Sequence, residues 1–280
     1  MKAEQFSGVV TGHGEGPVWW PGAGLRVCDG FAGRIRSLDD SGRVVADQHV
    51  GTFVGAFRPR EGGGLVAGNE RSFVLIDEVG SVQDLGDLWS STRLRMNDGG
   101  CDPQGRFYCG SMVFSGDAPE GVLYRLSPDG QVDVVLDKLF IPNGLVYAAD
   151  GALVYFIDTG TQAVRAYEVD DDGAWGAMRI VADLAGRSPD GMTIDAEGNL
   201  WVALWGEARV VCLDPVSGRE LESIEVDGAS QTSACTFGGA DLDQLFITTS
   251  NQDGAGGPRA GAVFVASPGV RGVLPTPFAG

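Results

Sequence analysis

Residues 188–205, SPDGMTIDAEGNLWVALW, place a tight turn directly before a short apolar run. The turn is Asp-Ala-Glu-Gly at 195–198, which is rich in turn-forming residues, and the apolar run after it predicts a β-strand. The same combination of turn and apolar run recurs along the whole chain. The first large apolar residues after the turns, used below as markers, are Leu25, Leu65, Phe107, Leu153, Leu200 and Leu245.

The spacing of these six markers predicts the fold, because they lie 40, 42, 46, 47 and 45 residues apart. A second hairpin of alternating apolar and polar residues follows each marker, so each repeat holds about four strands. These hairpins are expected at 33–45, 72–85, 121–136, 162–181, 208–226 and 261–275. Six such repeats predict an all-β, six-bladed β-propeller with four antiparallel strands per blade and a central channel.

The ring of blades must also be closed, since an open ring would expose strand edges. We expect residues around 6–10 to add a strand to the last blade and so to close it. On this interpretation residues 1–280 form a single propeller domain.

Composition limits the partners of the chain, which has a formal net charge of −18 and only two lysines. Such a surface repels phosphate backbones and anionic lipids, so we expect no nucleic acid and no membrane as a partner. With no apolar leader and no run of about 18 apolar residues, we expect a cytoplasmic protein. Five cysteines without a Cys-x-x-Cys pair predict reduced thiols and no disulfide. No apolar stripe demands a partner subunit, and we expect a monomer or a weak homo-oligomer.

Asp190 lies ten residues before its marker, at the start of the innermost strand of its repeat. Pseudo-symmetry places the equivalent residues at one height around the central axis. These six residues are Glu15, Gly55, Asn97, Asn143, Asp190 and Cys235. Carboxylates that converge in one channel repel each other unless a cation holds them together. The register therefore predicts a metal site, and its oxygen donors favour Ca²⁺, Mg²⁺ or Mn²⁺, with Zn²⁺ allowed.

Three residues near this ring have other expected roles. Cys235 is expected to be buried beside the site rather than to bind the metal. His13 lies two residues before Glu15, and a lone histidine in a glycine-rich loop is expected to be exposed. The tryptophans are expected to pack the blades, with Trp205 as a candidate wall of the pocket.

Other hydrolytic mechanisms have little support in the sequence. The chain has only two histidines, no Gly-x-Ser-x-Gly elbow and no His-Glu-x-x-His motif. These absences argue against a Ser-His-Asp esterase and against a zinc protease.

Five motifs, which span nearly the whole chain in order, carry a resemblance to a known family. They are GEGPVW at 14–19, RMNDG at 95–99 with DPQGRF at 102–107, PNGL at 142–145, PDGMTIDAEGNLWVA at 189–203 and FGGADLDQLFITT at 237–249. The ordered set resembles the gluconolactonase/regucalcin family of sugar-lactone hydrolases. That resemblance implies a six-bladed propeller with one divalent cation in its central channel.

The resemblance also implies roles for single residues. Glu15, Asn143 and Asp190 match the three metal-binding side chains of the family, and Asp190 also matches its proton acceptor. Arg95 and Asn97 match residues that contact the substrate. The neighbouring Asp98 is expected to lie behind these two residues. The alternative is that Asp98 only stabilises the turn. An acidic substrate contact of the animal members falls near Ser115 here, so that contact is absent or replaced.

The function that follows is a divalent-metal-dependent hydrolase, a lactonase that converts an aldonolactone such as gluconolactone to its aldonic acid. A cation would polarise the lactone carbonyl, and Asp190 would accept a proton from the attacking water. The cofactor is expected to be one divalent cation, either Ca²⁺, Zn²⁺, Mg²⁺ or Mn²⁺. Two alternatives remain open: a noncatalytic calcium-binding propeller and a phosphotriesterase-type hydrolase.

Overall fold

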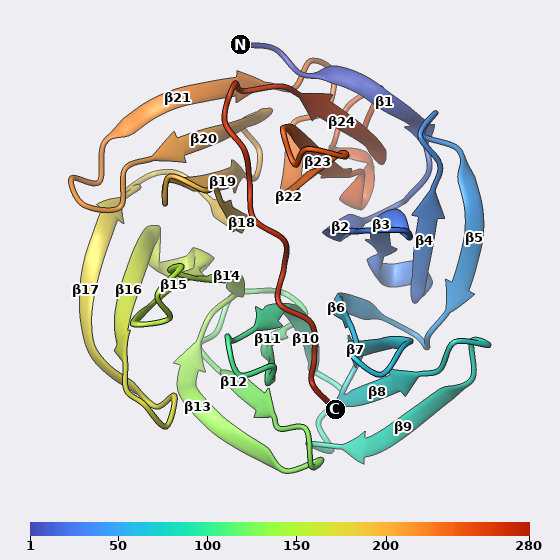
Figure 1. The fold of residues 1–280 in the computed structure, drawn as a ribbon, viewed down its shortest axis with the longest axis vertical. Coiled ribbons are helices and arrows are strands. Elements are labelled where there is room, and N and C mark those ends of the chain that lie inside the picture. The colour runs from blue at the N-terminus through green and yellow to red at the C-terminus, as the bar shows by residue number, and fades with distance from the viewer.

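The computed structural model, which describes residues 1–280, consists of six four-stranded antiparallel sheets arranged around one axis (Figure 1). The six-bladed propeller predicted from the repeats is therefore confirmed. Blade 1 comprises β2 (Gly14–Trp20), β3 (Gly24–Asp29), β4 (Arg34–Leu38) and β5 (Val44–His49). Blade 2 comprises β6 (Val54–Pro59), β7 (Leu65–Asn69), β8 (Ser72–Ile76) and β9 (Val82–Asp87). Blade 3 comprises β10 (Leu94–Cys101), β11 (Phe107–Val113), β12 (Gly121–Leu126) and β13 (Val132–Leu139).

The other three blades follow the same order from the axis outward. Blade 4 comprises β14 (Pro142–Tyr147), β15 (Leu153–Asp158), β16 (Ala163–Val169) and β17 (Trp175–Asp183). Blade 5 comprises β18 (Pro189–Ile194), β19 (Leu200–Leu204), β20 (Arg209–Leu213) and β21 (Glu220–Glu225). Blade 6 comprises β22 (Gln231–Gly238), β23 (Gln244–Ser250), β24 (Ala262–Ala266) and β1 (Glu4–Val9). Three short 3-10 helices complete the fold: η1 (Gly30–Ala32), η2 (Thr159–Thr161) and η3 (Gln252–Gly254).

The turn after β18 shows why the repeated motif forms a hairpin. The Asp195 carboxylate accepts hydrogen bonds from the backbone N–H groups of Glu197 and Asn199, at 2.9 and 2.8 Å. It also accepts one from the indole of Trp201, six residues later, at 3.0 Å. Gly198 takes a positive φ of 91°, a conformation that glycine adopts without steric cost. One carboxylate therefore fixes both the turn and the first buried aromatic residue of β19.

Blade 6 is completed from the two ends of the chain. β1 pairs with β24 in antiparallel fashion, with Glu4 opposite Val265, which confirms the predicted closing strand. The hairpin expected at 261–275 is wrong, because only β24 lies in that range. β1 occupies the place of the outermost strand, so the chain after Ala266 leaves the sheet.

The C-terminal segment 267–280 crosses one face of the ring (Figure 1). Near blade 6, the Gly272 N–H donates to the Leu242 carbonyl at 2.8 Å. At blade 2, the Phe278 N–H donates to the Pro59 carbonyl at 2.8 Å. The Phe278 ring is buried with Phe73 and other residues of blades 2 and 3. The segment thus connects opposite sides of the propeller.

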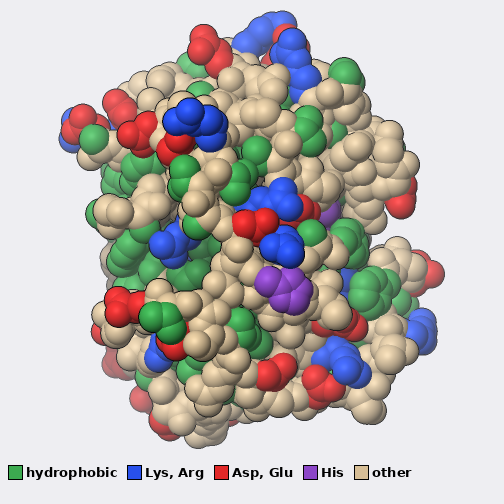
Figure 2. Space-filling view, turned by 90° about the vertical axis from the view of Figure 1, so that its right-hand side faces the viewer, with side chains coloured by type: hydrophobic (Ala, Val, Ile, Leu, Met, Phe, Trp, Pro, Cys, Tyr) green, Lys and Arg blue, Asp and Glu red, His purple; other side chains and the backbone are tan.

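The core lies between adjacent blades rather than at one centre. One cluster joins Trp201 of blade 5 to Phe237 and Phe264 of blade 6, for example. All five cysteines are buried and unpaired in such layers. On the side of the ring that carries β5, acidic and basic side chains alternate with scattered hydrophobic ones (Figure 2). No helix is both long enough and apolar enough to cross a membrane.

Candidate active site

The innermost strand of each blade has an irregularity in its pairing at or next to the predicted ring position. The register shifts lie between Glu15 and Val18, Val54 and Ala56, Met96 and Gly99, Pro142 and Leu145, Pro189 and Met192, and Thr232 and Ala234. A bulge leaves residues unpaired and bends its strand, which re-aims side chains toward the axis. The sequence repeat is therefore accompanied by a bulge that recurs in the innermost strand of every blade.

The bulged segments approach each other closely around the axis. A Cβ atom on Gly55 would lie 1.9 Å from the carbonyl oxygen of Asn97 in the next blade. A Cβ atom on Gly191 would lie 2.4 Å from the Cβ atom of Ala234. Only glycine fits at these two positions, so the glycines allow adjacent innermost strands to pack.

The sixth ring position is Ser233 and not Cys235, which corrects the register deduced from the markers. Ser233 occupies the bulge of β22, and its hydroxyl donates to the Gly14 carbonyl at 2.6 Å. Cys235 pairs with Ile247, and its thiol donates to the Trp201 carbonyl at 3.3 Å. β22 continues one residue further past its ring position than β18 does, and its marker is the second residue of β23. Counting back ten residues therefore ends two positions too late.

A cavity of about 330 Å³ lies at the ring. Five of the six predicted site residues line it: Glu15, Arg95, Asn97, Asn143 and Asp190. Its lining is mainly polar, and Trp205 forms part of the wall. Residues from blades 1, 3, 4 and 5 thus meet in one place, as the ring register requires.

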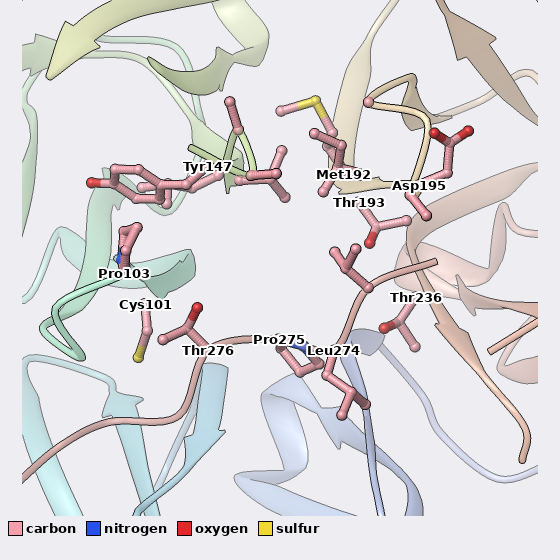
Figure 3. Close-up of a pocket in the computed structure, with 18 of the residues that line it drawn as sticks. Cys101, Pro103, Tyr147, Met192, Thr193, Asp195, Thr236, Leu274, Pro275 and Thr276 are labelled. Carbon is pink, nitrogen blue, oxygen red and sulfur yellow. The ribbon is translucent and has the colours of Figure 1, made fainter. Parts of the chain in front are cut away.

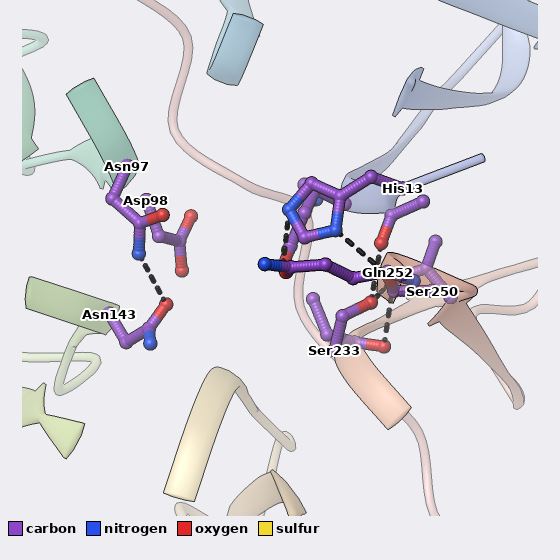
Figure 4. A network of polar contacts seen from close by, with 12 residues as sticks. His13, Asn97, Asp98, Asn143, Ser233, Ser250 and Gln252 are labelled. Carbon is purple, nitrogen blue, oxygen red and sulfur yellow. Dashed lines mark hydrogen bonds and ion pairs between the residues drawn. The ribbon is translucent and has the colours of Figure 1, made fainter. Parts of the chain in front are cut away.

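A chain of hydrogen bonds orders the amide side chains of this cavity, and Figure 4 shows its central link, between Asn97 and Asn143. Arg95 Nη1 donates to Asn97 Oδ1 at 2.6 Å. Asn97 Nδ2 in turn donates to Asn143 Oδ1 at 3.1 Å and to the Pro142 carbonyl at 2.9 Å. Asn143 Nδ2 donates to Thr159 Oγ1 at 2.8 Å. Both polar atoms of the Asn143 amide are therefore held, its oxygen by Asn97 and its nitrogen by Thr159, which also lines the cavity.

Aromatic rings surround the guanidinium of Arg95. Its Cζ lies 4.5 Å from the ring centre of Phe53, 5.5 Å from Phe31 and 5.9 Å from Phe114. Burial lowers the pKa of Arg95 to about 10, and nearby Glu15 and Asp190 oppose that change. Arg95 therefore stays charged at neutral pH, and cation–π contacts stabilise it in a buried place.

The two ring carboxylates lack a close cationic partner, since no Arg or Lys forms an ion pair with Glu15 or Asp190. Burial, together with the charge of Asp98, raises the pKa of Glu15 to about 8. Burial and the charge of Glu15 raise the pKa of Asp190 well above its ordinary value. Two such groups in one cavity are unfavourable when both are ionised.

The donor set at the ring fits a divalent cation. No group of three or more His, Cys, Asp and Glu side chains converges closely enough to hold a metal by itself. A cation here would depend on the amide oxygen of Asn143 in addition to the carboxylates of Glu15 and Asp190. The Asn143 oxygen accepts one hydrogen bond and has a second lone pair available. Two carboxylates and an amide carbonyl are ligands of hard cations such as Ca²⁺, Mg²⁺ and Mn²⁺.

Asp98 is the one predicted site residue that does not line the cavity. It lies beside Asn97 (Figure 4), and its carboxylate accepts a hydrogen bond from the Gly99 N–H at 2.7 Å. Burial raises the pKa of Asp98, and the charge of Arg58 opposes that rise. Asp98 thus adds negative charge close to Glu15 and Asp190 from behind the cavity wall.

His13 is buried, so its expected exposure is wrong. The backbone N–H groups of Gly12 and His13 donate to Asp29 at 3.0 and 3.1 Å and draw the loop inward. His13 Nδ1 lies 2.8 Å from Ser250 Oγ, and Nε2 lies 4.0 Å from Glu15 Oε1 (Figure 4). Burial and the charge of Arg95 lower the pKa of His13 to about 3, so the ring is neutral.

Several lining residues could not be found from the sequence. Thr159 accepts from Asn143 and donates to the Pro189 carbonyl at 2.6 Å, but no repeat position indicates it. Gln231 and Gln252 also line the cavity, and they come from the blade whose register was misassigned. The loop at 113–120, in contrast, is a wall that the sequence did indicate: Ser115 lines the cavity, and its hydroxyl donates to Asp117 at 2.6 Å.

A second cavity, of about 510 Å³, lies at the other end of the channel (Figure 3). Asp195, at the far end of β18 from Asp190, is one of its lining residues. The C-terminal segment crosses it with Leu274, Pro275 and Thr276. Twelve of its 22 lining residues are hydrophobic. The Asp195 carboxylate already accepts hydrogen bonds from Glu197, Asn199 and Trp201. The other lining carboxylate, Glu197, is exposed, so this cavity has no pair of buried carboxylates like Glu15 and Asp190, and the ring cavity is the stronger candidate for the site.

Comparison with known proteins gives consistent matches to one family. A family model described as "SMP-30/Gluconolactonase/LRE-like region" matches residues 13–251. The chain is similar to "Putative sugar lactone lactonase YvrE" of Bacillus subtilis (strain 168), with 34% identity over 280 residues and 95% of each chain covered. A regucalcin of Agrobacterium tumefaciens, described as a calcium-binding protein, has a TM-score of 0.90 at 24% identity and covers 99% of this chain and 97% of its own. A gluconolactonase of Xanthomonas campestris has a TM-score of 0.74 at 26% identity, with coverage of 92% and 86%.

Proposed function

This chain belongs to the SMP-30/gluconolactonase/LRE-like family, and we propose that it is a metal-dependent lactonase that opens sugar lactones to aldonic acids. One observation carries the proposal: Glu15 and Asp190 are buried carboxylates without a cationic partner, and they face the same cavity as Arg95 and Asn97. A cation and a small polar substrate would together satisfy these groups.

Glu15, Asn143 and Asp190 would hold the cation, which we propose to be Ca²⁺, Mg²⁺, Mn²⁺ or Zn²⁺. When bound, a divalent cation supplies Lewis acidity, which polarises an ester carbonyl and lowers the pKa of a water molecule. The Asn97 amide donates to the Asn143 oxygen and Thr159 accepts from the Asn143 nitrogen, so the Asn143 amide is fixed in one orientation. Asn143 is thereby preorganised as a ligand before any cation binds.

Asp190 is the proposed proton acceptor. As water adds to the lactone carbonyl carbon, an O–H bond of the water breaks and its proton moves to an Asp190 oxygen. The ring C–O bond then breaks, and the departing alkoxide takes the proton back from Asp190, which gives the hydroxy acid and restores the Asp190 carboxylate. The raised pKa of Asp190 makes it a better base than an exposed aspartate, while a bound cation would bring that pKa down. The pKa of Asp190 would therefore be lower in the cation-bound protein than in the cation-free protein.

Arg95 and Asn97 would orient the lactone. The guanidinium presents fixed donors, and three aromatic rings restrict its motion. Asn97 already uses both of its side-chain atoms within the protein, but its oxygen has a second lone pair for a sugar hydroxyl. A polyhydroxylated lactone suits this lining better than an alkyl lactone, because only four of the 17 lining residues are hydrophobic.

The experiment is an acid-release assay at constant pH with a panel of sugar lactones, corrected for spontaneous opening. We expect acid release that EDTA abolishes and that one of the four cations restores. A phosphotriester in the same assay tests the alternative hydrolase. A noncatalytic calcium-binding propeller predicts tight calcium binding without any acid release, and that result would contradict the lactonase proposal.

Asp190→Asn tests the assigned base. We expect acid release to be lost while the variant stays folded, since the amide keeps the size of the side chain. Asp241→Asn is a matched control, because Asp241 is exposed on the turn between β22 and β23. Full activity in the Asp190 variant would exclude the role proposed for it.

A further inference from the structure

The candidate active-site cavity does not end at His13. A third cavity, of about 540 Å³, shares His13, Gln252 and Asp253 with it. Its other walls are Gly12, Asp29, Phe31, Ala32 and Asn251. We call this third cavity the Phe31 groove. The three shared residues make it a continuation of the site on the same face of the propeller.

The Phe31 groove combines an aromatic surface with hydrogen-bonding groups. Phe31 is 46% exposed although its ring centre lies 4.8 Å from that of His13. One part of the ring thus packs against the active site, and the rest is open to the groove. Gln252 and Asn251 supply amides beside it. A sugar ring has apolar C–H faces and polar hydroxyls at its edge, which is the complement of such a lining.

The charges of the groove indicate that its occupant is uncharged. No Lys or Arg lines it, and its two acidic residues are Asp29 and Asp253. Asp29 is occupied by the loop N–H groups and by Arg36, whose Nη2 lies 3.1 Å away. A phosphate or a carboxylate in the groove would find no Lys or Arg in the lining and would be repelled by Asp253. A neutral polyol would meet only hydrogen-bonding partners.

We propose that the preferred lactone carries a second, neutral sugar unit, and that this unit lies in the Phe31 groove while the lactone ring lies at Glu15 and Asp190. This inference rests on the proposed lactonase function and deepens it. A monosaccharide lactone would occupy only the ring cavity. A two-ring lactone would occupy both cavities and bury Phe31.

The test compares glucono-1,5-lactone with cellobiono-1,5-lactone, which bears an additional glucosyl unit. Ala32→Trp should fill the groove, because Ala32 is exposed, lines the groove and does not line the ring cavity. Ala46→Trp is the matched control, since Ala46 is exposed on β5 outside both cavities. The wild type should open both lactones, with the higher kcat/KM for the two-ring lactone. Ala32→Trp should lower kcat/KM for the two-ring lactone by about tenfold or more and change that for the one-ring lactone by less than about twofold.

The groove proposal is overturned if the wild type does not open the two-ring lactone, or if Ala32→Trp leaves the ratio of the two kcat/KM values unchanged. Saturation-transfer NMR with cellobionate distinguishes failure of the groove proposal from failure of the lactonase proposal. Cellobionate contains no ester, so its binding can be measured without any hydrolysis. Its outer glucosyl protons should receive saturation from the wild type and from Ala46→Trp, but not from Ala32→Trp. If no lactone is opened and this NMR pattern holds, the sugar groove stands and the lactonase proposal fails. Equal saturation in all three proteins would overturn the groove.

Discussion

The side-chain amide of Asn97 donates a hydrogen bond to the amide oxygen of Asn143 over 3.1 Å. The first of these residues is a proposed substrate contact, and the second is a proposed metal ligand. If both roles hold, substrate binding and cation binding are expected to be coupled through this hydrogen bond between blades 3 and 4. A change at Asn97 should affect both.

Asn97→Ala should weaken cation binding although Asn97 itself is not a proposed ligand. Loss of the donor frees the Asn143 side chain to rotate, and loss of a partner behind a metal ligand typically costs about 10- to 100-fold in affinity. Titration calorimetry with Ca²⁺ and Mn²⁺ measures the effect. Asn199→Ala is the control, because that amide donates to Asp195 at the far end of the channel. An unchanged dissociation constant in Asn97→Ala would show that the hydrogen bond does not orient the ligand.

The cation-free protein should lose stability as the pH rises. The pKa of Glu15 is raised from 4.5 to about 8 in the folded state, chiefly by burial and then by Asp98. The protonated form is therefore favoured by folding, and this contribution is complete below about pH 4.5 and lost as the pH rises toward 8. The limiting slope for one such group is about 1.4 kcal/mol per pH unit. Urea unfolding in EDTA at a series of pH values measures it.

Glu15→Gln removes the titration of Glu15 and leaves the other charged groups of the chain in place, so it isolates the contribution of Glu15 to the pH dependence of the unfolding free energy. In EDTA its unfolding free energy should fall less steeply between pH 5 and 8 than that of the wild type, with Asp190 responsible for part of the remaining slope. Excess cation should oppose the loss in the wild type, because it binds the ionised carboxylates and stabilises the folded state. Identical pH slopes for the two proteins in EDTA would mean that Glu15 is not a buried titrating group.

Arg95→Lys should lower kcat/KM although the positive charge is kept. Lysine cannot reproduce the planar contact with Phe53, Phe31 and Phe114, and its ammonium is more strongly hydrated. We expect a loss of at least about tenfold, expressed mainly in KM if Arg95 only binds substrate. Arg179→Lys is the control, since that exposed guanidinium contacts only the Pro215 carbonyl. Wild-type kinetics in Arg95→Lys would show that stacking and planar geometry do not matter at this position.

The repeated turn made the architecture predictable, because the Asp195 turn and its equivalents are local features that need no tertiary information. The ring position of Asp190 followed from the same repeat. Ser233 did not, since a bulge is placed by the pairing of β22 with β23 and leaves no signal in residue spacing. The burial of His13 also escaped prediction, because it depends on Asp29, sixteen residues away in the chain.

The C-terminal crossing escaped prediction for a related reason. Residues 261–275 alternate like a hairpin, yet β1 already pairs with β24 and leaves the following chain without a place in the sheet. Competition between two distant segments for one strand edge cannot be read from either segment alone. We expect the segment to stabilise the fold, and a substitution at Phe278 tests this.

Phe278→Ala should strongly destabilise the fold although Phe278 lies outside the site. The ring is 2% exposed and packs with Phe73, Phe107 and Leu126 between blades 2 and 3. Its removal leaves a cavity beneath the end of the crossing segment, which would then be held to blade 2 only by hydrogen bonds such as that from the Phe278 N–H to the Pro59 carbonyl. Such truncations of a buried phenylalanine cost about 3–5 kcal/mol. Urea unfolding measures the loss, and Val216→Ala, at a side chain that is 87% exposed, should change stability by less than about 0.5 kcal/mol. A loss in Phe278→Ala no larger than that of the control would show that the crossing segment is not held by its phenylalanine.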